Sequence, residues 1–488
     1  MKRVVIIGAG LGGLSAAISL AARGFEVIVL EQQAEAGGKL QRMERNGYRF
    51  DRGPSTITMP HVFHRLFSSV GRQLADYVRL ERLEPSTRNL FADGHAVDFT
   101  SDLTAMEEQI ARYSPKDARM YRSFMTESKR LYDTSESLFL NRLLHHWRAK
   151  ADMRLLAGLL SVRPTTNYQS LLSRYFTHPN TLAMLGRYAT YVGSSPYQAP
   201  AIFAMLPYLE QQLGVYSVRD GTYELVAAMR KLAEELGVLF HFGCKVTSIN
   251  SSKGRVTGVS SDCGDYSAEL VIANGDVLSA ASQLLTERQR PSLRDRRMKK
   301  LEPSLSGYAM VAGVRKVYDQ LLHHTVFFPE GYGSEFDDIF RRKRLPTEPA
   351  IYVCHSGHSQ TGMAPEGCSN LFLLANAPYV TEENRHMLTG EDYGERLLLQ
   401  LERAGLQGLT ALLDYKQIYT PVQLEADTSA YRGGIYGISS NSARQTFFRP
   451  SNRGDLDGLW FVGGTTHPGG GTPLVTLSGM LVADAISS

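Results

Sequence analysis

Three glycines near the start of the chain have the spacing of a phosphate-binding turn. Gly8, Gly10 and Gly13 form a G-x-G-x-x-G pattern between an apolar run and a helical pattern. The first glycine permits a tight turn, the second lets the backbone approach a pyrophosphate, and the third lets helix and strand pack closely. Glu31 follows 18 residues after Gly13, where an acidic side chain can accept the hydroxyls of a ribose. The pattern predicts a dinucleotide site.

A strand, a helix and a second strand must hold these residues in place. Residues 4–7 are apolar and β-branched, which is typical of a strand buried on both faces of a parallel sheet. Ala16, Ala17 and Leu20 recur at helical spacing, and residues 25–30 predict a second strand that ends at Glu31. The N-terminus of the helix would direct free N–H groups at the phosphates. We therefore expect an α/β fold with a Rossmann-type domain.

Two further glycine-containing segments indicate which dinucleotide binds. A Gly-Gly-Lys run at residues 37–39 follows the acidic residue closely. Its backbone and basic side chain would reach the far side of the pyrophosphate in FAD, whereas an NAD-dependent dehydrogenase has no need of that loop. Gly53 and Pro54 predict a rigid bend that brings the backbone close to a flat ring. The predicted cofactor is FAD.

The C-terminal part of the chain predicts the rest of the site. Asn274 ends an apolar strand at the carboxyl edge of the sheet, where ligands collect in such folds. Gly463 and Gly464 follow a second apolar strand and precede a helix that starts near Pro473, whose N–H groups can stabilise negative charge on a reduced cofactor. His467 lies in this loop, either as a general base or as a residue that shapes the loop.

Composition excludes several classes of function. The chain has 488 residues, 43% of them hydrophobic, and a net charge of +4, which does not by itself indicate a nucleic-acid partner. Its 4 cysteines lack C-x-x-C spacing, so we expect no metal site, no disulfide framework and a reducing cytoplasm. No apolar run is long enough for a transmembrane helix, which leaves a soluble or monotopic protein.

Changes in glycine content and periodicity divide the chain into three parts. Residues 1–103, 214–295 and 420–488 predict a discontinuous FAD-binding domain, residues 104–213 a helical cap, and residues 296–419 a mixed or antiparallel sheet domain that binds substrate. Residues 137–163 combine leucines, several arginines and Trp147. Such a basic amphipathic segment either dips into a membrane leaflet or packs on its own neighbours. The first interpretation makes the cap membrane-facing and places the protein at the inner face of the cell membrane.

Four stretches together resemble one family across essentially the whole chain. VVIIGAGLGGLSAA, the segment from Glu31 to Lys39, GPSTITMP and FVGGTTHPGGGTPLVTLSG are similar to bacterial phytoene-desaturase-type carotenoid oxidoreductases. Within that family, GPSTITMPHVFHRLF, YVGSSPYQAPAIFAML and RGGIYGISSN resemble the branch of diaponeurosporene oxidases. The resemblance implies FAD contacts from Gly8, Gly10, Gly12, Gly13, Glu31, Gly38, Lys39, Val246, Gly463, Gly464, Thr472, Pro473 and Leu474.

The resemblance also implies a reaction. Enzymes of this branch oxidise a terminal methyl of an acyclic C30 carotenoid to an aldehyde, whereas their paralogues are desaturases that introduce double bonds. A carotene isomerase, an amine or protoporphyrinogen oxidase and a non-catalytic FAD-binding scaffold are further alternatives. A polyene has no polar group, so we expect a long apolar tunnel with few charged side chains. Electrons would pass from the flavin to oxygen or to a membrane quinone.

Overall fold

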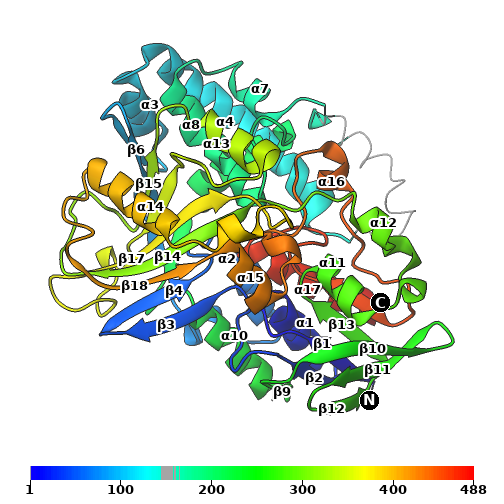
Figure 1. The fold of residues 1–488 in the computed structure, drawn as a ribbon. Helices are drawn as coiled ribbons and strands as arrows, with labels where there is room; N and C mark the ends of the chain where they lie inside the picture. Colours follow the sequence, from blue (N-terminus) through cyan, green and yellow to red (C-terminus); the bar gives the residue numbers. More distant parts are fainter. Residues whose placement is uncertain (1, 144–157, 159–160, 164) are drawn as a thin grey trace.

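The computed structural model describes residues 2–143, 158, 161–163 and 165–488. Two large sheets, three smaller ones and a set of helices make up this part of the chain (Figure 1). Both termini lie at the end of the molecule that holds the parallel sheet, and helices gather at the opposite end. The fold is thus mixed α/β, as predicted.

Segments far apart in the sequence form a five-stranded parallel sheet. Its strand order is β19 (Leu459–Val462), β13 (Leu270–Asn274), β1 (Arg3–Ile7), β2 (Glu26–Leu30) and β9 (Leu239–His241). Every neighbouring pair is parallel, so the carboxyl ends of all five strands share one edge. Val4, Val5 and Ile6 are fully buried in the central strand. Val4 and Ile6 pack with residues of the helices on one face, and Val5 packs on the other face with Val246, Ile249 and Val259 of a small antiparallel sheet.

Two helices place their N-termini at that edge. Helix α1 (Leu11–Ala21) begins directly after Gly10, and α17 (Thr472–Ser487) begins directly after Gly471. The two helices pack against each other at small residues, since a Cβ on Gly479 would lie 2.4 Å from the backbone oxygen of Gly12. This close packing brings the first and last predicted glycine loops to the same edge.

A mixed seven-stranded sheet forms the second layer. Its order is β18 (Leu413–Tyr419), β14 (Ser306–Val314), β17 (Ser369–Ala377), β16 (Ile351–Cys354), β15 (His324–Phe328), β6 (Thr87–Phe91) and β7 (Ala96–Phe99). All pairs are antiparallel except β15 with β6. Residues 87–99, grouped by sequence pattern with the cofactor-binding segments, form a hairpin that pairs with β15. That partner lies more than two hundred residues later in the chain, and no local pattern indicates the pairing.

Helices fill the described part of residues 104–213. They are α3 (Leu103–Ala111), α4 (Pro115–Ser135), η2 (Glu136–Leu140), α7 (Tyr168–Leu172), α8 (Pro179–Gly186), η3 (Arg187–Val192), η4 (Ala201–Met205), α9 (Leu206–Tyr208) and η5 (Leu209–Leu213). Most of the basic amphipathic segment at residues 137–163, including Trp147, lies outside the described residues. Among the described residues, no helix combines the length and the apolar character needed to cross a bilayer.

Smaller elements complete the description. Three short sheets contain β3 (Gln41–Arg45) with β4 (Tyr48–Arg52), β5 (Leu80–Leu83) with β8 (Val215–Val218), and β10 (Val246–Ser252) with β11 (Arg255–Ser261) and β12 (Gly264–Ser267). The remaining α-helices are α2 (Pro60–Ser68), α10 (Glu224–Glu235), α11 (Val277–Leu284), α12 (Asp295–Met298), α13 (Gly333–Asp337), α14 (Asp392–Arg403), α15 (Pro421–Thr428) and α16 (Ala443–Phe447).

Candidate cofactor and substrate site

A cavity of about 400 Å³ lies at the carboxyl edge of the parallel sheet. Most of the residues predicted to contact the cofactor line it. They are Gly8, Gly10, Gly12, Glu31, Gly38, Lys39, Gly53, Pro54, Val246, Asn274, Gly463, Gly464 and Thr472. These residues come from strands and loops spread over the whole chain, so the fold brings together what the sequence separates.

The glycines make room for a ligand and for the neighbouring backbone. Gly8 has φ +97°, and a Cβ there would lie 2.6 Å from the backbone oxygen of Asn274. A Cβ on Gly13 would lie 2.2 Å from the backbone oxygen of Gly8. Gly13 does not line the cavity, so its part is the close packing of α1 on β1, one of the functions expected of this motif. The glycines thus allow close backbone packing at this edge, and the cavity lined by Gly8, Gly10 and Gly12 fits a bound dinucleotide.

Glu31 lies directly after β2 with its carboxylate held in place. Its Oε2 accepts a hydrogen bond from the Ala9 N–H at 2.7 Å, and its Oε1 accepts one from the Gln33 N–H at 2.9 Å. Burial raises the pKa of Glu31, and these backbone donors oppose that rise. Each carboxylate oxygen can accept more than one hydrogen bond, so the group can also receive ribose hydroxyls.

Lys39 and Arg449 hold the segments that surround the cavity. Lys39 Nζ donates to the backbone oxygens of Gly434 (3.2 Å) and Ile435 (2.5 Å), and burial lowers its pKa. Arg449 donates to the backbone oxygens of Gly464 and Tyr436 at 3.0 and 3.2 Å. Burial lowers the pKa of Arg449 to about 10, and Asp276 opposes this shift. Sequence reasoning missed Arg449, because nothing in its spacing distinguishes it from a surface arginine.

A second cavity of about 320 Å³ adjoins the first. The two share lining residues, among them Gly53, Pro54, Tyr436, Gly471 and Thr472. Pro473 and Leu474, expected to contact FAD, line the second cavity and not the first. Most of its wall is apolar or aromatic, with contributions from Phe139, Leu140, Ile202, Phe203, Leu206, Leu209, Val326, Phe372 and Leu374. An elongated hydrophobic ligand could therefore reach the edge of the cofactor cavity.

The second cavity also carries a buried ion pair, one of the few sets of charged side chains in its wall. Arg187 Nη2 lies 3.6 Å from Glu210 Oε2, and the two side chains are 6% and 1% exposed. Arg187 Nη1 donates to the hydroxyl of Tyr191 at 2.7 Å, and the Tyr188 hydroxyl donates to Glu210. Burial alone would lower the pKa of Arg187, but Tyr191 and Glu210 raise it above its ordinary value. Burial raises the pKa of Glu210.

His467 lies in the wall of the second cavity and contacts the helical segment. Its Nε2 is 2.8 Å from the backbone oxygen of Phe139, in η2. A carbonyl oxygen can only accept, so Nε2 carries the proton and donates. The backbone oxygen of His467 accepts from Asn452 Nδ2 at 3.0 Å. This arrangement supports the interpretation that His467 shapes the loop between β19 and α17.

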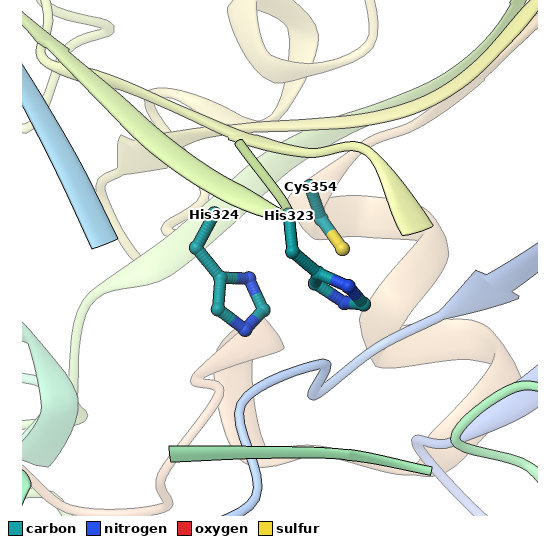
Figure 2. Close-up of side chains that lie close together, drawn as sticks. All are labelled: His323, His324 and Cys354. Carbon is teal, nitrogen blue, oxygen red and sulfur yellow. The ribbon is translucent and has the colours of Figure 1, made fainter. Parts of the chain in front are cut away.

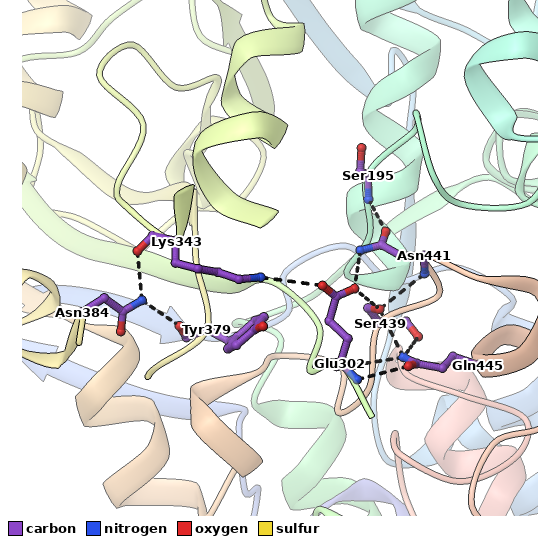
Figure 3. Close-up of polar contacts among 8 residues, drawn as sticks. All are labelled: Ser195, Glu302, Lys343, Tyr379, Asn384, Ser439, Asn441 and Gln445. Carbon is purple, nitrogen blue, oxygen red and sulfur yellow. Dashed lines mark hydrogen bonds and ion pairs between the residues drawn. The ribbon is translucent and has the colours of Figure 1, made fainter. Parts of the chain in front are cut away.

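A polar cluster holds another wall of the second cavity in position. Glu302 Oε2 accepts from Asn441 Nδ2 at 2.8 Å and from Ser439 Oγ at 3.0 Å, and Lys343 Nζ lies 3.6 Å from Glu302 Oε1 (Figure 3). Asn441 Oδ1 accepts from the Ser195 N–H at 2.9 Å. The cluster thus connects the helical part of the chain to residues 436–449, which carry Tyr436, Ser440, Thr446, Phe447 and Arg449 into the cavity wall.

Comparison with known proteins agrees with this geometry. A family model described as flavin containing amine oxidoreductase matches residues 11–487. A 4,4'-diapolycopene oxygenase from Methylomonas sp. is 37% identical over 99% of this chain and 98% of its own, and a 4,4'-diaponeurosporene oxygenase from Staphylococcus haemolyticus is 35% identical over 100% and 97%.

Solved structures share the fold. Putrescine oxidase bound to putrescine superposes with a TM-score of 0.65 at 14% identity, covering 100% of this chain and 99% of that one. An oxidoreductase from Methanosarcina mazei gives a TM-score of 0.66 at 18% identity, covering 99% and 100%. The chain therefore belongs to the family of flavin-containing amine oxidoreductases, and it is an FAD-dependent oxidoreductase.

Proposed function

We propose that this enzyme oxidises the terminal methyl of an acyclic carotenoid, of the C30 class, to an aldehyde. The observation that carries the proposal is the pair of adjoining cavities, one lined by glycines and one by apolar and aromatic side chains. The names of the 37% and 35% identical relatives, which specify C30 carotenoids and an oxygenase reaction, support the substrate and the reaction.

The glycine-lined cavity would hold FAD. The backbone at Gly8, Gly10 and Gly12 would contact the pyrophosphate, and Glu31 would accept the ribose hydroxyls. The remaining proposed contacts, with the adenine, the pyrophosphate and the flavin ring, come from Gly38, Lys39, Gly53, Pro54, Val246, Asn274, Gly463, Gly464, Thr472, Pro473 and Leu474. Bound FAD supplies a two-electron acceptor.

The side chains of the second cavity would determine which carbon reacts. Its apolar walls would hold the polyene in one line, and the shared residues Tyr436, Gly471 and Thr472 mark the place where substrate and cofactor meet. Conversion of a methyl to an aldehyde adds one oxygen and removes two hydrogens, so water or oxygen must reach the reacting carbon. A cavity wall that keeps water away from the inner carbons of the polyene would direct oxidation to its terminal carbon.

We also propose that the protein works at the inner face of the cell membrane, where such a substrate is dissolved. The basic amphipathic composition of residues 137–163 supports this proposal. Polar replacements of Leu144 and Trp147 are expected to reduce binding to anionic liposomes while FAD stays bound, with Leu143 left unchanged because it is buried in the hydrophobic core. Unchanged partitioning of the variant would contradict the proposal. The three-part division into a cofactor-binding domain (1–103, 214–295 and 420–488), a helical cap (104–213) and a substrate-binding sheet domain (296–419) belongs to the same proposal.

The deciding experiment is expression in cells that accumulate acyclic C30 carotenoids, followed by mass analysis of the pigments. Terminal oxidation predicts products that gain one oxygen and lose two hydrogens at each oxidised end. Loss of hydrogens alone would identify a desaturase, and a product of unchanged mass an isomerase. Assays of the purified enzyme with oxygen or with a quinone then identify the electron acceptor.

A further inference from the structure

Three side chains with metal-ligating atoms meet where β15 pairs with β16. His324 lies opposite Cys354 in the antiparallel register, and His323 directly precedes β15. Figure 2 shows both imidazole rings and the sulfur on the same side of these strands. One ligand atom from each residue lies within 4.8 Å of the other two, and all three residues are buried. No sequence spacing indicated this cluster, because strand pairing brings Cys354 to the histidines.

Hydroxyl groups orient both imidazole rings. His323 Nδ1 is 2.6 Å from Ser359 Oγ, and His324 Nδ1 is 2.7 Å from the hydroxyl of Tyr352. Among the described residues, Nε2 of the buried His324 has no hydrogen-bond partner. In proteins that bind metals, a ligating histidine usually has its second ring nitrogen fixed by such a partner, and the ligating nitrogen faces the ion.

A small polar cavity adjoins the cluster. Its volume is about 20 Å³, and its lining includes His323, Cys354, Ser55 and Gln360. The side-chain oxygen of Gln360 is buried and has no partner among the described residues. A volume of roughly 10–15 Å³ is enough for one water molecule with polar neighbours. The cavity thus has space for one water molecule beside His323 and Cys354, whereas His324 does not line it.

We propose that His323, His324 and Cys354 bind one Zn²⁺ ion, with a water molecule as the fourth ligand. Two imidazoles and one thiolate suit Zn²⁺ and disfavour Mg²⁺ and Ca²⁺, which prefer oxygen ligands. A tetrahedral zinc site holds its nitrogen and sulfur ligands roughly 3.4–3.6 Å apart. The ligand atoms of the three residues, which lie within 4.8 Å of one another, must therefore approach each other by about 1 Å when the ion binds. Binding releases the thiol proton of Cys354 to solvent as the sulfur–zinc bond forms.

The position of this ion suggests a structural effect. Ser55 Oγ and the Tyr352 hydroxyl share a hydrogen bond of 2.6 Å, and both residues line the substrate cavity. Tyr352 also holds His324. An ion bound to the cluster would thus fix β15, β16 and the segment after Pro54 as one wall. The proposal stands on the side chains of this cluster and does not depend on the carotenoid reaction.

The test is the zinc content of the full-length holoenzyme, purified without a metal-affinity tag from zinc-supplemented cells. Elemental analysis is expected to find close to one zinc per chain in the wild type and in the control Cys368→Ser, whose cysteine lies outside the cluster. Cys354→Ser is expected to lose at least about tenfold in zinc while keeping its FAD absorbance. A wild type without zinc, or a Cys354→Ser protein with as much zinc as the wild type, would overturn the proposal.

A second variant and a second probe cover the case in which Cys354→Ser does not fold. Ser359→Ala removes the group that orients His323 and is expected to weaken zinc binding about 10- to 100-fold. Wild-type protein reconstituted with Co²⁺ should show a thiolate-to-cobalt charge-transfer band in the near ultraviolet. The Cys368→Ser control should show the same band. If the band is missing in the wild type, or if Ser359→Ala binds zinc as tightly as the wild type, the site is not a metal site.

Discussion

Asn274 and Gly8 join two neighbouring strands at the edge where the cofactor cavity opens. Asn274 Nδ2 donates to the backbone oxygen of Gly8 at 3.1 Å, across 266 residues of sequence. The backbone oxygen of Asn274 in turn lies only 2.6 Å from the position that a Cβ on Gly8 would take. This relationship fixes the turn between β1 and α1, and it requires glycine at position 8.

Replacing Gly8 by alanine tests that requirement. The new methyl would lie 2.6 Å from the Asn274 oxygen, and φ +97° is strained for alanine. We expect a loss of about 1–3 kcal/mol in unfolding free energy and a protein that retains little FAD after gel filtration. In the control Gly390→Ala, the Cβ meets nothing within 4 Å at a φ that is not positive, so its effect should stay within about 0.5 kcal/mol. Equal FAD content in the two variants would contradict the prediction.

Glu335 predicts a pH dependence of stability. Its carboxylate accepts from the Ala350 N–H at 2.8 Å and from Asn376 Nδ2 at 2.6 Å, yet burial raises its pKa from 4.5 to about 7. A raised pKa in the folded state means that the stabilising contribution is fully present below about pH 4.5 and is lost as the pH rises to about 7. The difference in pKa corresponds to about 3 kcal/mol.

Chemical denaturation of the wild type and of Glu335→Gln between pH 5 and pH 8 measures this contribution, because most of the loss falls between the ordinary pKa of 4.5 and the raised pKa of about 7. The uncharged amide has no proton to lose, so the variant should show a flatter dependence on pH than the wild type. Parallel curves for the two proteins would mean that another group is responsible.

The buried pair of Arg187 and Glu210 predicts a destabilisation that a second substitution relieves. Arg187→Met leaves Glu210 buried without its cation and should cost about 3–5 kcal/mol in unfolding free energy. Adding Glu210→Gln removes the isolated charge, so the double variant should recover much of that loss. The exposed pair of Arg255 and Asp457 is the control, and Arg255→Met should change stability by less than about 1 kcal/mol. A double variant less stable than Arg187→Met would contradict this account.

Local patterns were sufficient to predict the parallel sheet and the residues around the cofactor cavity. Gly8, Glu31 and Gly463 each follow a buried strand, and the ends of parallel strands meet at one edge. Their neighbours in the structure could thus be inferred from short windows of sequence. The family resemblance implied contacts of Pro473 and Leu474 with the flavin, and both residues line the adjoining cavity.

The features that could not be predicted from the sequence depend on pairing between segments that are far apart in the chain. The hairpin of residues 87–99 joins the second sheet through β15, and Cys354 meets His324 through strand register. Arg187 and Glu210 come from η3 and η5, which meet at the second cavity. Taken alone, each of these residues is of a type that occurs at ordinary helix or strand positions. No periodicity marks a buried charge whose partner lies on another element.

His467→Gln separates the two interpretations of that residue. A glutamine can donate from its side-chain amide to the Phe139 oxygen, as His467 Nε2 does now, but it cannot act as a base near neutral pH. If His467 shapes the loop, aldehyde formation should keep a kcat within a few-fold of the wild type, with FAD bound. His467→Ala removes the hydrogen bond and should lower stability by about 1 kcal/mol. A fall in kcat of about 10²–10⁴ in His467→Gln, with full FAD content, would instead identify His467 as the general base.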